Sequence, residues 1–187
     1  MNIDTVLLNP PSDDEIQFPV SIHRKLQKSV LCKLIWQHQF FAGLDKQHVE
    51  LLASLAMETR FEPGQYVAKE GDLANRFYLI LDGAVEMQSG SDDGLIQKLG
   101  AGDPLGWSWL FEPHFFHFSA RAVEPTNSIF FYGTILRHYC EDDHDLGYEI
   151  MRRFGRVMVK DWMVYRKISR DIQDVATSFG QNSATIK

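Results

Sequence analysis

Residues 61–86 read Phe-Glu-Pro-Gly-Gln-Tyr-Val-Ala-Lys-Glu-Gly-Asp-Leu-Ala-Asn-Arg-Phe-Tyr-Leu-Ile-Leu-Asp-Gly-Ala-Val-Glu, and this stretch decides the fold. Its Pro63-Gly64 pair predicts a turn, because proline presets φ and glycine permits a positive φ. Tyr66 and Val67 then open a strand, which ends at Glu70-Gly71-Asp72, where the glycine allows a sharp bend. The stretch therefore begins with a turn, a short strand and a glycine elbow.

A second strand follows the elbow. Residues 77–81 form an unbroken apolar and aromatic run that ends at Asp82-Gly83, a strong tight-turn pair. Val85 and Met87 resume an alternating strand after this turn. The pattern predicts a hairpin whose two strands meet at Gly83.

Two strands, a glycine elbow and a hairpin at this spacing resemble the cyclic-nucleotide-binding domain of the bacterial Crp/Fnr regulators, protein kinase A and cyclic-nucleotide-gated channels. The resemblance runs from about Phe40 to Met163. It implies an α+β fold: a double-stranded β-helix or jelly roll with N-terminal helices and a long C-terminal dimerisation helix. The close-set Gly, Pro, Asp and Ser clusters from Glu62 to about Leu136 independently favour a small barrel or jelly roll.

Composition limits the range of functions. The chain has 187 residues, of which 44% are apolar and 24% charged, and this suits one soluble domain with appendages. A net charge of −6 without a long basic run argues against a nucleic-acid partner. No run of about 18 apolar residues predicts a membrane span, and the acidic N-terminus does not resemble a signal peptide. We therefore expect a cytoplasmic protein in which Cys32 and Cys140 are reduced thiols.

The chain divides into five predicted segments. They are an extended arm (1–20), an N-terminal helical segment (21–60), a β-roll ligand-binding core (61–142), a C-terminal helix (143–175) and a polar tail (176–187). Ser21 is the expected start of the first helix, and Asp45 the expected N-cap of a second helix that runs to about Thr59. A hairpin loop is expected at residues 90–94.

The C-terminal helix carries apolar residues at three- and four-residue spacing, from Leu146, Ile150 and Phe154 through Val157, Met158, Trp162, Tyr165, Ile168 and Ile172. Such a helix either packs on its own roll or pairs with its twin. We expect a homodimer through this helix, because the apolar stripe continues past the end of the roll. No helix-turn-helix follows Arg166, so the expected output goes to a protein partner and not to DNA.

The resemblance also implies where a ligand would bind. In the family, a glycine–glutamate pair opens the phosphate cassette, and an arginine about ten residues later pairs with the cyclic phosphate. Residues 105–123 read Leu-Gly-Trp-Ser-Trp-Leu-Phe-Glu-Pro-His-Phe-Phe-His-Phe-Ser-Ala-Arg-Ala-Val here. Gly106 matches the glycine, Trp107 replaces the glutamate, and Phe116 or His117 replaces the arginine. Because a buried anion without a charged partner is costly, we expect weak or absent affinity for cAMP and cGMP.

One arginine lies close to the cassette. Arg121 is four or five residues downstream of the family position, and on a strand it would share a face with His117 and Ser119. A bulge in the cassette would bring it into the pocket. The candidate ligand-binding residues are therefore Gly106, Trp107, Ser108, Phe116, His117, Ser119 and Arg121.

The aromatic residues of the cassette leave three interpretations open. Their own side chains fill the pocket, or the pocket accepts another small apolar or aromatic ligand, or it still binds a cyclic nucleotide. For a new ligand, Ser108 could orient it, His117 could titrate, and Trp107 could stack on its ring. The sequence identifies no cofactor with certainty.

Catalytic and metal motifs are not found. There is no Gly-x-Ser-x-Gly elbow and no His-Glu-x-x-His, and His114 and His117 would point to opposite faces of a regular strand. The acidic residues Asp142, Asp143 and Asp145 suit the start of the C-terminal helix. We therefore predict a non-catalytic regulatory or sensory module. The alternatives are a ligand-free structural adaptor, a metal-dependent jelly-roll enzyme and, more weakly, a haem sensor using His23, His38 or His48.

Overall fold

The computed structural model describes residues 20–89 and 94–183. The helical elements are α1 (Val20–Gln37), the 3-10 helix η1 (Gln39–Phe41), α2 (Lys46–Leu55), the 3-10 helix η2 (Trp107–Leu110), α3 (Gly133–Asp142) and α4 (His144–Ser183). The strands are β1 (Met57–Phe61), β2 (Tyr66–Ala68), β3 (Arg76–Asp82), β4 (Ala84–Ser89), β5 (Gly94–Gly100), β6 (Pro104–Leu105), β7 (Ser119–Ala122) and β8 (Thr126–Tyr132).

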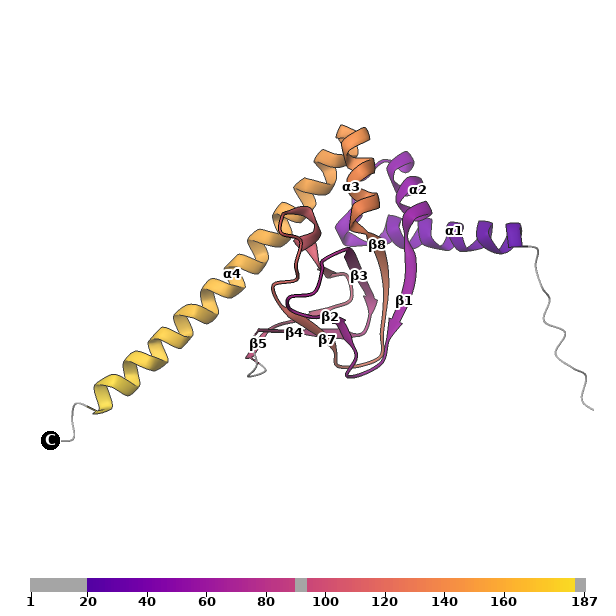
Figure 1. The fold of residues 1–187 in the computed structure, drawn as a ribbon. Helices are drawn as coiled ribbons and strands as arrows, with labels where there is room; N and C mark the ends of the chain where they lie inside the picture. Colours follow the sequence, from indigo (N-terminus) through magenta and orange to yellow (C-terminus); the bar gives the residue numbers. More distant parts are fainter. Residues whose placement is uncertain (1–19, 90–93, 184–187) are drawn as a thin grey trace, which may run out of the picture.

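The strands form a roll of two antiparallel sheets, in the orders β1-β8-β3-β6 and β2-β7-β4-β5. Figure 1 shows α2 and α3 at one end of this roll, while α1 and the far half of α4 extend away from it in different directions. The predicted α+β jelly roll with N-terminal helices and a long C-terminal helix is confirmed. The β4–β5 pairing agrees with the hairpin expected around residues 90–94, although residues 90–93 lie outside the described chain.

The predicted hairpin at Gly83 is wrong. β3 pairs with β6 and β8, whereas β4 pairs with β5 and β7, so the Asp82-Gly83 turn carries the chain from one sheet to the other. Gly83 has φ +88°, and a Cβ there would lie 2.5 Å from the Pro125 carbonyl oxygen. The missing side chain and the left-handed backbone together make this crossing possible.

We predict that Gly83→Ala lowers the free energy of unfolding by about 3 kcal/mol, because the methyl group meets backbone atoms in a strained conformation. Gly71 is the matched control, since it has φ +83° but open space where its Cβ would be. Gly71→Ala should cost about 1 kcal/mol, from backbone strain alone. Urea unfolding of both variants measures the difference, and equal losses would contradict the crossing described above.

The two faces of β3 belong to different clusters of the core. Phe77 and Leu79 pack against the helices, in a cluster that includes residues from η1, α2, α3 and α4. Tyr78 and Ile80 point to the interior of the roll, where they pack with residues of the second sheet. This alternation follows from the two-residue period of a strand. The fully apolar run of β3 is thus explained by burial on both faces.

The first turns of α4 are fixed to the molecule's own core. Leu146, Ile150 and Phe154 are buried there, and the Arg153 guanidinium donates to the Ala42 carbonyl oxygen at 2.8 Å. The interpretation of a helix packed on its own roll is therefore correct for this half of the helix. Trp162 is exposed and lies on a different face of the helix, so the single apolar stripe that the sequence suggested is two stripes on different faces.

Several segment boundaries differ from those expected. β1 begins at Met57, inside the segment expected to be helical, because residues 57–61 form a ladder with β8. α3 begins at Gly133, which packs against Trp109, inside the segment expected to be β-roll. α4 continues to Ser183, through most of the expected polar tail. The expected arm lies outside the described residues apart from Val20, which begins α1.

Two predicted helix caps are confirmed. The Asp45 carboxylate accepts from the His48 backbone N–H at 2.8 Å. The Asp143 carboxylate accepts from the backbone N–H groups of Asp145 and Leu146, both at 3.1 Å. The Leu146 N–H, more than the His48 ring, lowers the pKa of Asp143. Since the His48 ring lies 2.9 Å from Asp45 and 3.1 Å from Asp143, it joins α2 to the start of α4.

Cys32 and Cys140 are free cysteines, and burial raises the pKa of the Cys140 thiol to about 11. In the described part of the chain, no helix is both long and apolar enough to cross a membrane.

Candidate functional site

A small cavity lies between the second sheet, the segment from Gly106 to Phe118, and α4. Its volume is about 60 Å³, well below the roughly 300–1,000 Å³ of typical small-molecule sites. Five aromatic or imidazole rings line it, those of Trp107, Phe116, His117, Phe118 and Tyr165. Small and aliphatic side chains from β2, β4, β5, β6 and β7 complete the wall. The roll thus retains only a narrow, mainly apolar pocket.

Gly106 places the aromatic segment at the cavity. It has φ +90°, and a Cβ on it would lie 2.9 Å from the Arg76 carbonyl oxygen and 3.2 Å from the Phe116 ring. Only glycine therefore fits between β3 and Phe116 at this point. The η2 turn begins directly after it, with Trp107 at the cavity and Ser108 buried beside it.

The long C-terminal helix closes the cavity with a carboxylate. The Trp107 indole Nε1–H donates to Asp161 at 3.0 Å, and the Gln97 amide Nε2–H donates to the other oxygen of Asp161 at 3.2 Å. Four residues further along α4, the Tyr165 ring contacts Phe118 with centroids 5.8 Å apart. We call the contact of Asp161 with Trp107 and Gln97 the α4 latch. It connects the cassette, β5 and α4 at one point.

The electrostatics of the α4 latch are those of a partly desolvated anion. Burial raises the pKa of Asp161 above 3.8, its ordinary value, although the hydrogen bonds from Trp107 and Gln97 oppose this rise. Lys160, next to it in the chain, has its ammonium 3.0 Å from the Asp103 carboxylate. Among the cavity-lining residues, all of which the structure describes, there is no lysine or arginine.

Five of the seven predicted site residues line the cavity: Gly106, Trp107, Ser108, Phe116 and His117. Phe116, at one of the two positions aligned with the family arginine, packs its ring against Gly106. Its backbone bonds to the glycine elbow, through Gly71 N–H to its oxygen and through its own N–H to the Asp72 oxygen, both at 2.9 Å. The His117 ring lies 6.5 Å from the Trp107 indole.

The structure places Ser119 and Arg121 outside the cavity, which corrects the face predicted for them. Ala120 lines the cavity, so its neighbours on β7 point the other way. The Arg121 Nε–H donates to the Gly64 carbonyl oxygen at 2.9 Å, and its guanidinium lies 5.7 Å from the Tyr66 ring centroid. The Ser119 hydroxyl accepts from the Glu70 N–H at 3.1 Å. His117 precedes β7, so it does not share the strand's alternation.

Asp161, Gln97 and Tyr165 are absent from the predicted site. A signal for Asp161 exists in the sequence, because it follows Phe154 and Val157 at the spacing of the buried face of α4. A carboxylate at a position that packing alone would fill with an apolar side chain is a local conflict, and such conflicts mark functional sites.

The other histidines whose side chains the structure describes are not grouped as metal ligands. In the described chain, no three His, Cys, Asp or Glu residues are arranged to hold a metal ion. His114 lies beside the Arg137 guanidinium, and the Nδ1 of buried His38 accepts from the Phe40 N–H at 3.1 Å. His48 lies between the carboxylates of Asp45 and Asp143. The structure does not describe the side chain of His23.

Comparison with known proteins gives consistent results. Residues 58–143 match the model of the cyclic nucleotide-binding domain family. Over 96 residues the chain is 29% identical to the dog cyclic nucleotide-gated channel beta-3. The match covers 51% of this chain but only 12% of the channel. A crystal structure from Geobacter metallireducens, provisionally named a cyclic nucleotide-binding protein, is 27% identical with a TM-score of 0.62. The match covers 67% of this chain and 92% of that one.

The regulatory subunit of a protein kinase A from Trypanosoma brucei shares the fold. The kinase is named as cAMP-independent, and the match to its regulatory subunit has a TM-score of 0.65 at 20% identity, covering 76% of this chain and 50% of that one. A triple mutant of the trypanosomal subunit, in which one substitution changes threonine to arginine, is named as bound to cAMP.

Proposed function

Because residues 58–143 are a cyclic nucleotide-binding domain by sequence match and by fold, we propose that this chain is a non-catalytic regulatory module whose pocket no longer takes cAMP or cGMP. One observation carries the proposal. The charged side chain at the cavity is the Asp161 carboxylate, and no lysine or arginine lines the described cavity. A cyclic phosphate entering there would lose its hydration and meet a negative charge, which disfavours binding.

The trypanosomal comparison supports this reasoning. A regulatory subunit of this fold comes from a kinase named as cAMP-independent, and a variant of that subunit that gains an arginine, among other changes, is named as cAMP-bound. The chain described here has Phe116 and His117 at the positions where the family arginine is expected. The loss of that guanidinium removes the bidentate partner that phosphate recognition relies on.

We further propose that the module acts as a homodimer through α4. Four exposed apolar residues form a stripe at helical spacing on a different face of α4 from its buried residues: Tyr148, Met151, Val159 and Trp162. We call this the outer stripe. Gly155 lies within it, and a Cβ there would meet nothing within 4 Å. A mid-helix glycine costs about 1 kcal/mol relative to alanine, and the close approach of a second helix at this point would explain it.

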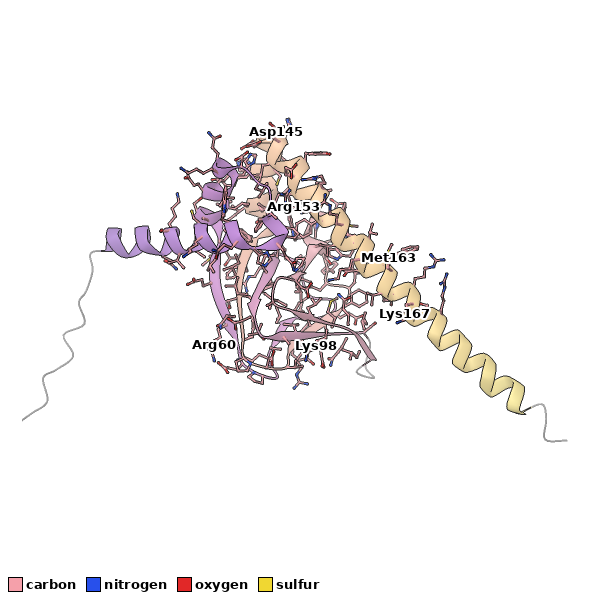
Figure 2. The ribbon with its side chains drawn as sticks, turned by 180° about the vertical axis from the view of Figure 1, so that it is seen from behind. Arg60, Lys98, Asp145, Arg153, Met163 and Lys167 are labelled. Atoms are coloured by element: carbon pink, nitrogen blue, oxygen red, sulfur yellow. The ribbon has the colours of Figure 1, made fainter. Side chains whose placement is uncertain are left out.

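The two faces of α4 suggest how the module signals. Asp161 and Tyr165 contact the cavity, while the outer stripe is free to contact a second copy. In Figure 2, α4 continues past the strands beyond Lys167. A small rotation of α4 at the α4 latch would therefore displace the far end of the helix by a larger distance. A ligand that displaced Asp161 would shift α4 and with it the surface offered to a protein partner. The small volume of the cavity also favours the alternative of a ligand-free structural adaptor.

Isothermal titration with cAMP and with cGMP tests the proposal. We expect no one-to-one binding tighter than a Kd of about 100 µM, which corresponds to roughly −5.5 kcal/mol. Circular dichroism and thermal unfolding of the same sample would establish that the protein is folded. One-to-one heat with a lower Kd for either nucleotide would contradict the proposal.

A further inference from the structure

The cavity has a carboxylate, that of Asp161, at a wall made mainly of apolar and aromatic side chains. Asp161 lies on the face of α4 that buries Phe154 and half-buries Val157, where an apolar side chain would pack at no electrostatic cost. Two neutral donors, Trp107 and Gln97, hold it, and no cationic side chain lines the described cavity. The molecule therefore maintains a carboxylate without a counter-ion at the wall of an aromatic pocket.

A carboxylate among aromatic rings is the chemistry that recognises an organic ammonium group. Tryptophan offers the most favourable ring face to a cation, and tyrosine and phenylalanine contribute as well. An ammonium also forms charge-assisted hydrogen bonds with a carboxylate. Both kinds of group meet at Asp161, with Trp107 bonded to it and Tyr165 one helical turn away.

We propose that this cavity binds a small protonated alkylamine, with Asp161 as its counter-ion. The inference rests on the proposed function, since it names the ligand class of a pocket that no longer takes an anion. The cavity of about 60 Å³ restricts the ligand to a small one.

The geometry leaves room for the ion pair. Trp107 and Gln97 occupy one hydrogen-bond position on each oxygen of Asp161, and a carboxylate has about four such positions. An ammonium can therefore bind without breaking either bond. The other charged or titratable groups near Asp161 are Lys160, which is paired with Asp103, and His117 and Tyr165 at the cavity wall. None of these supplies a permanent positive charge to the cavity.

Titration of the full chain with isopropylamine and with 2-propanol, its neutral analogue, tests the proposal. Calorimetry and tryptophan fluorescence at pH 7 are suitable, in phosphate buffer because Tris and imidazole are themselves amine-type competitors. We expect isopropylamine to bind at least tenfold more tightly than the alcohol. Asp161→Asn should lower the affinity for the amine at least tenfold, because it removes the negative charge of the carboxylate. The Gln97 amide can turn to keep its hydrogen bond with the new side chain.

Two further variants make the result specific. Glu86→Gln removes a carboxylate of β4 that does not line the cavity, and it should change amine affinity less than threefold. Trp107→Phe keeps an aromatic ring and the Asp161 charge but removes the indole donor, so this variant should still bind the amine. It provides a second test in case Asp161→Asn does not fold.

Three results would overturn the inference: equal affinity for the alcohol and the amine, unchanged amine affinity in Asp161→Asn, or no amine binding at millimolar concentration. In these cases the proposed function stands as long as cAMP and cGMP do not bind. Tight binding of a cyclic nucleotide would overturn both.

Discussion

Replacing Phe154 by alanine is expected to lower the free energy of unfolding by about 3–5 kcal/mol. The Phe154 side chain is 1% exposed, and its ring centroid lies 4.7 Å from that of Phe77, 5.1 Å from Phe40 and 5.9 Å from Trp109. It therefore joins α4 to β3, to η1 and to η2 at once. Its loss leaves a cavity where four elements meet, and the surrounding rings cannot collapse fully into it.

Chemical denaturation measures the effect, with Phe111→Ala as the control. Phe111 is the same residue type but is 43% exposed, so its truncation should cost less than about 1 kcal/mol. Similar losses in the two variants would show that α4 is not fixed to the roll through Phe154. The effect also concerns function, because Asp161 reaches the cavity only if the first turns of α4 stay in place.

Replacing Trp162 by glutamate is expected to convert a dimer of this chain into a monomer. The Trp162 side chain is 59% exposed and lies in the outer stripe. In a symmetric helix pair, glutamate would remove a large apolar contact from each copy and bring in two like charges. We expect the Kd of the dimer to rise at least about 100-fold, which corresponds to a loss of only about 2.7 kcal/mol of association free energy.

Light scattering over a concentration series measures this change. Trp36→Glu is the matched control, because Trp36 is 56% exposed but lies on α1. It should leave the dimer intact. A wild-type chain that remains monomeric at the highest attainable concentration would contradict the dimer proposal, as would equal effects of the two substitutions.

Most of the fold is predictable because local signals and packing agree. The turn at Pro63-Gly64, the elbow at Gly71 and the apolar run of β3 each specify their local geometry. The sheet to which β4 belongs is not specified locally. A tight-turn pair predicts a hairpin by default, and the crossing at Gly83 depends on Thr126 and Pro125, which are distant in sequence.

The site is less predictable, because two of its lining residues, Asp161 and Tyr165, come from the distant helix α4. The segment from Gly106 to His117 could be identified by its position after the roll signature, and its two ends, residues 106–108 and 116–117, do line the cavity. The orientation of Arg121 depends on where β7 begins, since a shift of one residue reverses every side chain on a strand. Asp161 could be found only by separating the two faces of α4, and this needs the contacts of Leu146, Ile150 and Phe154 with the roll.

The α4 latch is the central claim of this account, and the indole N–H resonance of Trp107 tests it most directly. In 15N-labelled protein, Trp107→Phe would assign this resonance among those of the four tryptophans. The account predicts that its chemical shift titrates with a midpoint above pH 3.8, as the Asp161 carboxyl loses its proton, and that Asp161→Asn abolishes this titration. An indole resonance that is the same in Asp161→Asn and does not respond to pH would show that α4 does not close the cavity through Asp161.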